Sequence, residues 1–125
     1  MPKQLIQTDK APIPGGAYSQ ALRAGDFIFV AGTVPKHPVT GAVPETIEEQ
    51  TAQVMENIKA ILEAGGATLD DVVKATVHLS DLSLFERYNK VYASYFNDPK
   101  PVRTTVGSQL NNIMVEIDVI AYVGK

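Results

Sequence analysis

The sequence predicts a single α+β domain of two layers, in which a mixed β-sheet carries two helices on one face. Two segments repeat apolar residues at helical spacing, while several shorter ones alternate apolar and polar residues as strands do. Their order along the chain is β, β-β, α, β, α, β-β, which is typical of helices segregated on one side of a sheet. A length of 125 residues suits one domain, so residues 1–125 are interpreted as one unit.

Three strands are expected in the first third of the chain. Residues 3–8 alternate well enough for a short edge strand, and the two prolines and two glycines of residues 11–16 then indicate a loop. Residues 18–34 contain two strands joined by a tight turn at residues 24–26. The second of these strands is apolar at every position of 27–30, which predicts a central strand covered on both faces.

The first long helix is expected over residues 47–64. Thr46 is a favourable N-cap residue, and Glu49 three positions later completes a capping box. Gly65-Gly66 indicates a left-handed cap at the other end. The apolar residues that fall on one stripe of this helix are Ile47, Val54, Ile58, Ile61 and Leu62.

The middle of the chain is expected to add a strand and a second helix. Residues 73–80 alternate apolar and polar side chains, as in a half-buried strand. Ser83, with Glu86 three positions later, predicts another capping box at the start of the second helix. That helix should end near residues 96–98, ahead of two prolines.

Two more strands close the chain, at residues 102–108 and 113–122, with Asn111-Asn112 expected as a hairpin loop between them. If both helices cover one face of the sheet, no segment is left to cover the apolar residues of the other face. An exposed apolar sheet face on a domain of this size implies a partner, most simply further copies of the same chain.

Composition excludes several classes of function. The chain has no cysteine, and its two histidines, His37 and His78, are far apart in sequence, so we expect no metal site. A formal charge of −3 argues against general nucleic-acid binding and gives no support for binding to a membrane. The N-terminal segment lacks the apolar core of a signal peptide, so a cytoplasmic protein is expected.

Two charged residues inside predicted strands are the candidates for chemistry. Arg103 is either a solvated edge residue or a planar fork aimed at a carboxylate, and its position alone leaves both open. Glu116 interrupts an apolar run, so it either faces water or lies in a cleft beside Arg103 as a general base. A hydroxyl nucleophile at Thr104 or Thr105 would need a base beside it.

Four stretches carry motifs of a known family, in order and at matching spacings. GGAYSQA (residues 15–21) is similar to a G-P-Y-S-Q-A segment, and residues 27–44 resemble a strand followed by a P-x-T-G loop. Residues 50–81 resemble the family's first helix and next strand. PVRTTVGSQL (101–110) with MVEIDVIA (114–121) matches a P-x-R signature and a hydrophobic-Glu-Ile strand. Along essentially its whole length, the chain resembles the RidA/YjgF family of reactive intermediate deaminases.

This resemblance implies a chorismate-mutase-like fold that forms a homotrimer, with a barrel-like core, helices outside and clefts between neighbouring subunits. It also implies a 2-iminobutanoate/2-iminopropanoate deaminase without a metal or organic cofactor. In that reaction 2-aminoacrylate tautomerises to 2-iminopropionate, which takes up water and yields pyruvate and ammonia. The implied partners are a small 2-imino or 2-keto acid and further copies of the chain, and neither nucleic acid nor a membrane.

Site residues follow from the resemblance by position. Arg103 matches the arginine that grips the substrate carboxylate, Glu116 the glutamate that orients or activates water, and Tyr18 a tyrosine whose hydroxyl lies at the cleft. The residues implied along the bound substrate are Gly32, Thr33, Asn89 and Thr105.

Some positions depart from the family pattern. Ala31, Thr33 and Thr105 replace a frequent serine, glutamine and cysteine, and Asn111-Asn112 replaces leucine-proline, so the substrate preference stays open. A different aminoacrylate-type substrate is one alternative. Another is a non-catalytic module that binds a 2-keto acid, although such a sensor needs only Arg103 and not Glu116. A ribonuclease is disfavoured by the acidic charge balance and the lack of a basic-aromatic patch.

Overall fold

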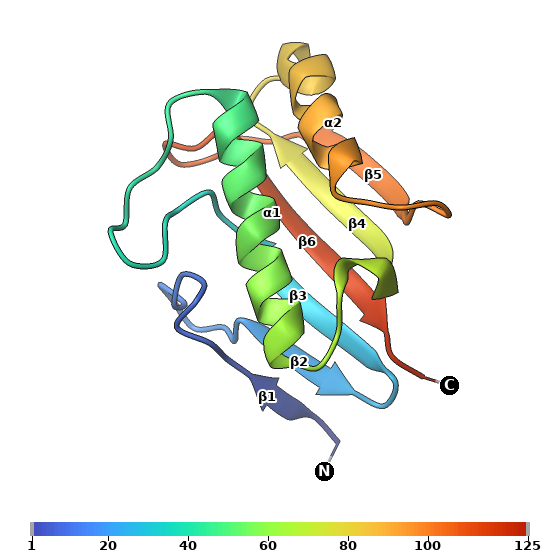
Figure 1. Ribbon diagram of the computed structural model, residues 1–125. Helices are drawn as coiled ribbons and strands as arrows, with labels where there is room; N and C mark the ends of the chain where they lie inside the picture. Colours follow the sequence, from blue (N-terminus) through green and yellow to red (C-terminus); the bar gives the residue numbers. More distant parts are fainter. Residues whose placement is uncertain (1, 125) are drawn as a thin grey trace.

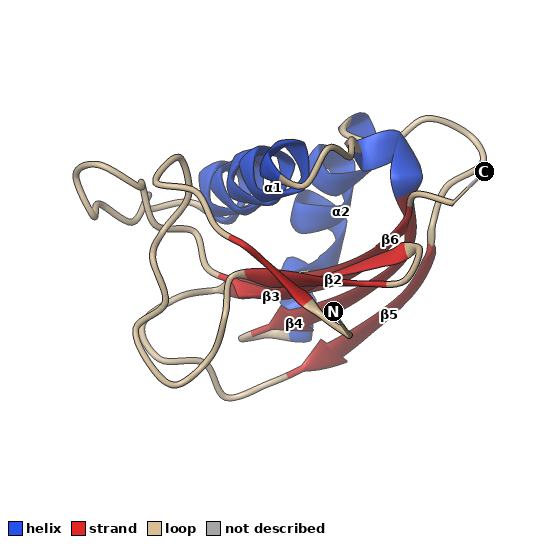
Figure 2. Ribbon diagram, turned by 90° about the horizontal axis from the view of Figure 1, so that it is seen from below, coloured by secondary structure: helices blue, strands red, loops and turns tan. Residues whose placement is uncertain are grey.

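Six strands form one mixed sheet, in the order β1-β2-β3-β6-β4-β5, and both helices lie on the same face of it (Figures 1 and 2). This computed structural model describes residues 2–124. Its elements are β1 (Gln4–Ile6), β2 (Ala21–Ala24), β3 (Phe27–Thr33), α1 (Ile47–Ala64), η1 (Leu69–Asp71), β4 (Val72–Leu79), η2 (Leu82–Leu84), α2 (Phe85–Ser94), β5 (Val102–Gly107) and β6 (Val115–Tyr122). The predicted two-layer α+β fold is confirmed. No helix among the described residues is long and apolar enough to cross a membrane.

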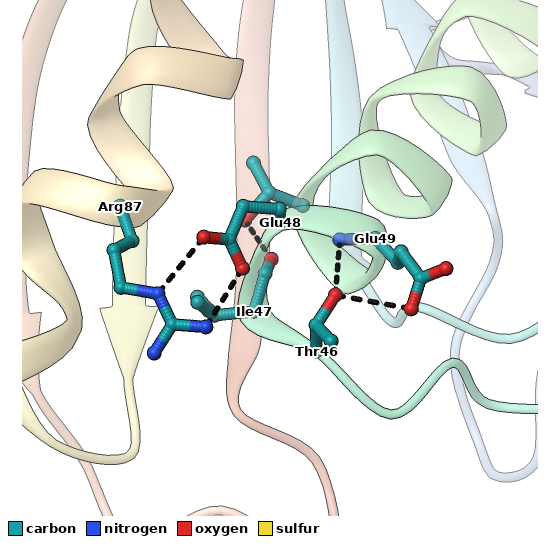
Figure 3. Close-up of polar contacts among 6 residues, drawn as sticks. Thr46, Ile47, Glu48, Glu49 and Arg87 are labelled. Atoms are coloured by element: carbon teal, nitrogen blue, oxygen red, sulfur yellow. Dashed lines mark hydrogen bonds and ion pairs between the residues drawn. The ribbon is translucent and has the colours of Figure 1, made fainter.

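Helix α1 begins and ends as its sequence predicts. The hydroxyl of Thr46 accepts a hydrogen bond from the Glu49 amide at 3.1 Å and donates to the Glu49 carboxylate at 3.0 Å (Figure 3). At the other end Gly66 has φ of +81°, the left-handed conformation that glycine adopts without steric cost. Arg87 of α2 donates to both carboxylate oxygens of Glu48, at 2.8 and 2.9 Å, which ties the two helices together.

The start of α2 differs from its prediction. Asp81 caps the short 3-10 helix η2 that precedes α2: its carboxylate accepts a hydrogen bond from the Ser83 amide at 2.8 Å. Ser83 lies inside η2, and α2 begins at Phe85 with Leu84 as its N-cap residue, which makes no side-chain cap hydrogen bond. The predicted capping box of Ser83 with Glu86 is therefore wrong, because the chain enters α2 through the 3-10 turn and not from an extended Ser83. The same helix buries Tyr88 and Tyr92 against the sheet.

The last two strands do not form a hairpin, so that prediction is also wrong. Both pair with β4: β5 runs parallel to it on one side, and β6 runs antiparallel to it on the other. Residues 108–114 therefore cross the end of β4, with Asn112 at a φ of 62°. The physical reason is burial: β6 has four fully buried apolar positions, which a central strand between β3 and β4 covers and an edge strand would expose. These positions are Val115, Ile117, Val119 and Ala121.

The two faces of the sheet differ in what covers them. On β3, Ile28 and Val30 are buried under the helices, whereas Phe27 and Phe29 on the opposite face are 40% and 44% exposed. The prediction that this strand is covered on both faces is therefore wrong for a single chain. Phe27, Phe29 and Tyr122 are also in contact, with ring centroids 5.2 to 6.4 Å apart, and form an apolar patch on the open face.

Candidate functional site

Arg103 is held in place by side chains of α2. From β5 its Nη1 donates to the Tyr88 hydroxyl at 3.2 Å and to the Asn89 side-chain oxygen at 2.7 Å. Its Cζ lies 4.8 Å from the ring centre of Tyr92 and 5.3 Å from that of Phe85, within the range of cation–π attraction. Arg103 is therefore not a freely solvated edge residue. Because Nη1 carries two of the five guanidinium hydrogens, the edge formed by Nε and Nη2 remains for a ligand.

A hollow of about 350 Å³ opens beside this guanidinium. We call it the arginine hollow, and its lining residues are Asn89, Tyr92, Ala93, Lys100, Pro101 and Arg103. Burial raises the pKa of Tyr92 to about 12, to which neighbouring Tyr88 adds and which the Arg103 charge opposes. Tyr92 therefore stays neutral at physiological pH. It contributes an aromatic surface to the hollow, and the charge beside it is that of the Arg103 guanidinium.

Glu116 lies on β6 against the backbone of β3. A Cβ atom added at Gly32 would collide with the Glu116 carboxylate, so a larger residue there would displace this carboxylate from its position. The pairing of β3 with β6 shifts register between Val30 and Thr33, and Gly32 lies within that irregularity. No side-chain hydrogen bond to Glu116 occurs among residues 2–124, so this carboxylate keeps its acceptor capacity for water or a ligand.

Tyr18, Gly32 and Thr33 line a second hollow, of about 210 Å³, which we call the tyrosine hollow. Its walls come from residues 12–20, residues 31–36 and Ile61 of α1. Tyr18 lies in a loop ahead of β2, not in a strand, and is 54% exposed with its hydroxyl accepting from the Gly15 amide at 3.2 Å. Thr33 is buried and its hydroxyl donates to the Ala31 carbonyl at 2.9 Å, so its hydroxyl hydrogen is engaged within the chain.

Buried amide side chains fix the walls of the tyrosine hollow. Asn57 of α1 donates to the carbonyls of Val34 and Lys36, both at 3.0 Å. Gln20 accepts from the Thr8 amide at 2.8 Å and donates to the Pro12 carbonyl at 2.8 Å. Both side chains are almost fully buried. Their hydrogen bonds therefore satisfy backbone groups that water cannot reach.

Arg103 and Glu116 lie on opposite faces of the sheet. In the parallel pair of β4 and β5, Arg103 is level with Ala75, which is buried under the helices. In the antiparallel pair of β4 and β6, Glu116 is level with His78, on the face without helices. Within one chain the two side chains therefore do not converge on one cleft, and any site that uses both needs two copies of the chain.

Asn89 and Thr105 lie on the Arg103 side. Asn89 orients the guanidinium directly, and Thr105 lies two residues further along β5 on the same face, with a buried hydroxyl that has no partner among residues 2–124. The aromatic wall of Phe85, Tyr88 and Tyr92 was not identified from the sequence as part of a site. Their spacing of three and four residues, on a helix next to a strand with an arginine, was the available signal.

No group of three or more His, Cys, Asp or Glu side chains in the described part of the chain is arranged to hold a metal ion. The polar groups of the two hollows are a guanidinium, two ammonium groups, amides, hydroxyls and backbone. Such groups bind and orient a small anion through hydrogen bonds and charge.

The family described as Endoribonuclease L-PSP matches residues 8–123. A RutC family protein of Pyrococcus abyssi is 52% identical, over 98% of this chain and 98% of its own. Reactive Intermediate Deaminase A, chloroplastic, of Arabidopsis thaliana is 43% identical, over 95% of this chain and 65% of its own. The crystal structure of RidA from an Antarctic Psychrobacter species has a TM-score of 0.92 and 43% identity, covering 96% of this chain and 99% of that one.

The fold and these hollows thus define a class of small α+β proteins whose surface hollows are lined by polar and cationic side chains. Within that class, the chain belongs to the RidA/YjgF family.

Proposed function

We propose that this protein hydrolyses small 2-imino acids, the tautomers of reactive enamines such as 2-aminoacrylate, to 2-keto acids and ammonia. Water adds to the C=N carbon, one proton passes to the nitrogen, and the C–N bond of the resulting carbinolamine breaks. The carbinolamine hydroxyl becomes the keto group and ammonia leaves, so one imine and one water give one keto acid and one ammonia. No redox cofactor is needed for this balance.

The observation that carries the proposal is the free edge of Arg103. Three aromatic rings and two hydrogen bonds from Nη1 fix the guanidinium, and Nε with Nη2 remain as a planar fork. A fork of this geometry binds a carboxylate through two parallel hydrogen bonds. In the proposal the α-carboxylate of the substrate occupies this fork, which fixes where the imine carbon lies.

Glu116 is the proposed group for the water. A carboxylate with no hydrogen bond from the described chain is free to accept one from water and to take its proton as the water attacks. Gly32, Thr33 and Thr105 would border the substrate, and Tyr18 would contribute its hydroxyl at the cleft. Asn89 would act by orienting Arg103.

The proposed catalytic unit is an intersubunit cleft of a homotrimer. Two findings support it: Arg103 and Glu116 lie on opposite faces of one sheet, and the open face carries a patch of half-exposed aromatic residues. If neighbouring copies cover that patch, the Glu116 face of one copy can approach the Arg103 edge of the next.

A second candidate is a module that binds 2-keto acids without turnover. One observation favours this module: the residues that orient Arg103 all come from the same chain, so the proposed carboxylate binding does not need Glu116. The two candidates share the carboxylate grip and differ in whether Glu116 contributes to a reaction.

One assay tests the proposal. An amino-acid oxidase generates 2-iminopropionate from alanine in the presence of catalase, and semicarbazide trapping follows the remaining imine with and without the protein. We expect the imine to disappear faster in proportion to protein concentration, with pyruvate and ammonia formed in equal amounts. An unchanged rate, together with calorimetric binding of pyruvate, would identify the binding module instead.

A further inference from the structure

We propose that Lys100 makes the arginine hollow selective for 2-imino acids with a second carboxylate, a specificity that rests on the proposed function. The α-carboxylate would occupy the free edge of Arg103, and the carboxylate at the far end of the substrate would bind the Lys100 ammonium. Lys100 would thus select among substrates, and it would take no part in the reaction at the imine carbon.

The first observation is the charge of the hollow. Two of its six lining residues, Arg103 and Lys100, are cations, and none of the six is acidic. The chain as a whole, by contrast, has a formal charge of −3. One carboxylate neutralises one of the two cations, so a ligand with a single carboxylate leaves the second charge unmatched.

The second observation is how Lys100 is held. Its Nζ donates to the Phe96 carbonyl at 3.0 Å, just beyond the C-terminal end of α2, and to the Asp98 carboxylate at 3.3 Å. Those contacts restrain the ammonium, and the side chain that lines the hollow is 46% exposed. Because an ammonium has three hydrogens, one is left for a ligand even with both bonds in place.

Among residues 2–124 the carboxylate paired with Lys100 is that of Asp98, and this pair does not replace the second carboxylate of the proposed ligand. Its side chain is 89% exposed, and exposed ion pairs of this kind contribute little to stability. A ligand whose α-carboxylate is bound at Arg103 would therefore compete well with Asp98 for the Lys100 ammonium. Its second carboxylate belongs to a molecule that is already bound, so its effective concentration at Lys100 is high.

A second surface hollow supplies the contrast. Its lining residues are Glu48, Glu86, Arg87 and Lys90, so two cations there are matched by two carboxylates. Arg87 already binds Glu48 through two hydrogen bonds. Lys90 is therefore a matched control for Lys100: it carries the same charge, lies near the same helix and belongs to a hollow with no excess of positive charge.

The experiment compares two substrates of equal chain length that differ at the far end. An amino-acid oxidase generates 2-iminoglutarate from glutamate and 2-iminopentanoate from norvaline, and the kcat and KM of each are measured. We expect the native protein to favour 2-iminoglutarate. Lys100→Met should raise the KM for 2-iminoglutarate by about tenfold with kcat little changed, because the far carboxylate is bound equally in ground and transition states. Lys90→Met should leave the kcat and KM of both substrates unchanged.

Calorimetry with the product acids tests binding independently of turnover. Native protein should bind 2-oxoglutarate more tightly than 2-oxopentanoate, and Lys100→Met should abolish that difference. Asp98→Asn, which frees the ammonium, should strengthen 2-oxoglutarate binding by about two- to threefold, as loss of a weak exposed pair allows. Raising the salt concentration should weaken the binding of 2-oxoglutarate more than the binding of 2-oxopentanoate.

The outcomes separate this inference from the proposed function. Hydrolysis of both imines with no preference for 2-iminoglutarate, and no effect of Lys100→Met, would overturn the role of Lys100 and leave the deaminase standing. Failure to hydrolyse either imine would overturn the deaminase, and the calorimetric comparison would still decide the role of Lys100. Equal losses in Lys100→Met and Lys90→Met would show a general charge effect and contradict the inference.

Discussion

The surroundings of Arg103 and those of Glu116 are built in different ways. Arg103 is oriented within one chain, by hydrogen bonds to Tyr88 and Asn89 and by the rings of Phe85 and Tyr92. Glu116 has no side-chain hydrogen bond among residues 2–124, and it lies on the face of the sheet without helices. A single chain therefore orients the Arg103 guanidinium and leaves the Glu116 carboxylate without a side-chain partner among residues 2–124. The difference teaches that the two halves of the proposed site have different structural requirements: the proposed carboxylate binding needs one chain, and the proposed turnover needs two.

The largest effect is expected at Arg103. Arg103→Ala should lower kcat/KM for imine hydrolysis by about 10³-fold, because two charge-assisted hydrogen bonds worth roughly 1.5–3 kcal/mol each are lost. Arg103→Lys should lose most of the activity as well, since an ammonium cannot reproduce the planar fork. Steady-state kinetics measure both variants, with circular dichroism as the control for folding. Near-native activity of the lysine variant would contradict the bidentate grip.

Glu116 should affect turnover and leave affinity nearly intact. Glu116→Gln keeps the shape of the side chain and removes its basicity, so kcat should fall by about 10²-fold, the usual scale for a general base. Calorimetric binding of pyruvate should change little, because water activation is felt mainly in the transition state. A variant that hydrolyses imines at the native rate would make Glu116 a structural residue and place water activation elsewhere.

Mixing the two inactive variants tests whether one site draws on two chains. Light scattering should first show roughly three times the chain mass of 13.5 kDa, as a closed trimer requires. Unfolding and refolding an equal mixture of Arg103→Ala and Glu116→Gln should then restore activity at about a quarter of the sites. In a cyclic assembly with random subunit order, about that fraction combines an intact Arg103 with an intact Glu116 from the neighbour. No recovery in mixed trimers would contradict the shared site.

The smallest effect is expected at Asp118, two residues beyond Glu116 on the open face. Burial raises the pKa of this carboxyl, and the charges of His78 and Lys74 oppose that effect. A raised pKa means that ionisation of Asp118 costs stability at neutral pH, so Asp118→Asn should raise the free energy of unfolding by about 0.5 kcal/mol or less. This gain should shrink as the pH falls through the raised pKa, because the native carboxyl is then neutral too. Urea unfolding at pH 7 and pH 3.5 measures it, and a loss of stability at pH 7 would contradict it.

Local sequence determined much of this fold. The hydroxyl of Thr46 and the carboxylate of Glu49 are three residues apart, and Gly66 can adopt positive φ, so the ends of α1 follow from neighbouring residues alone. The same holds for the alternation along β4 and for the two-layer arrangement, because hydrophobic periodicity reports which side of an element is buried. The motifs around Tyr18, Arg103 and Glu116 were also sufficient to identify the family.

Tertiary structure decided which residues share a face. A hairpin and a crossover have the same local sequence requirements on either side of Asn111-Asn112, and only the burial of β6 between β3 and β4 selects the crossover. That choice sets the register that turns Glu116 toward Gly32 and away from the helices. Arg103 was identifiable from sequence, but the aromatic wall that orients it comes from α2, which long-range packing brings over β5. Strand order and facing depend on contacts between residues far apart in the chain, and local patterns do not encode them.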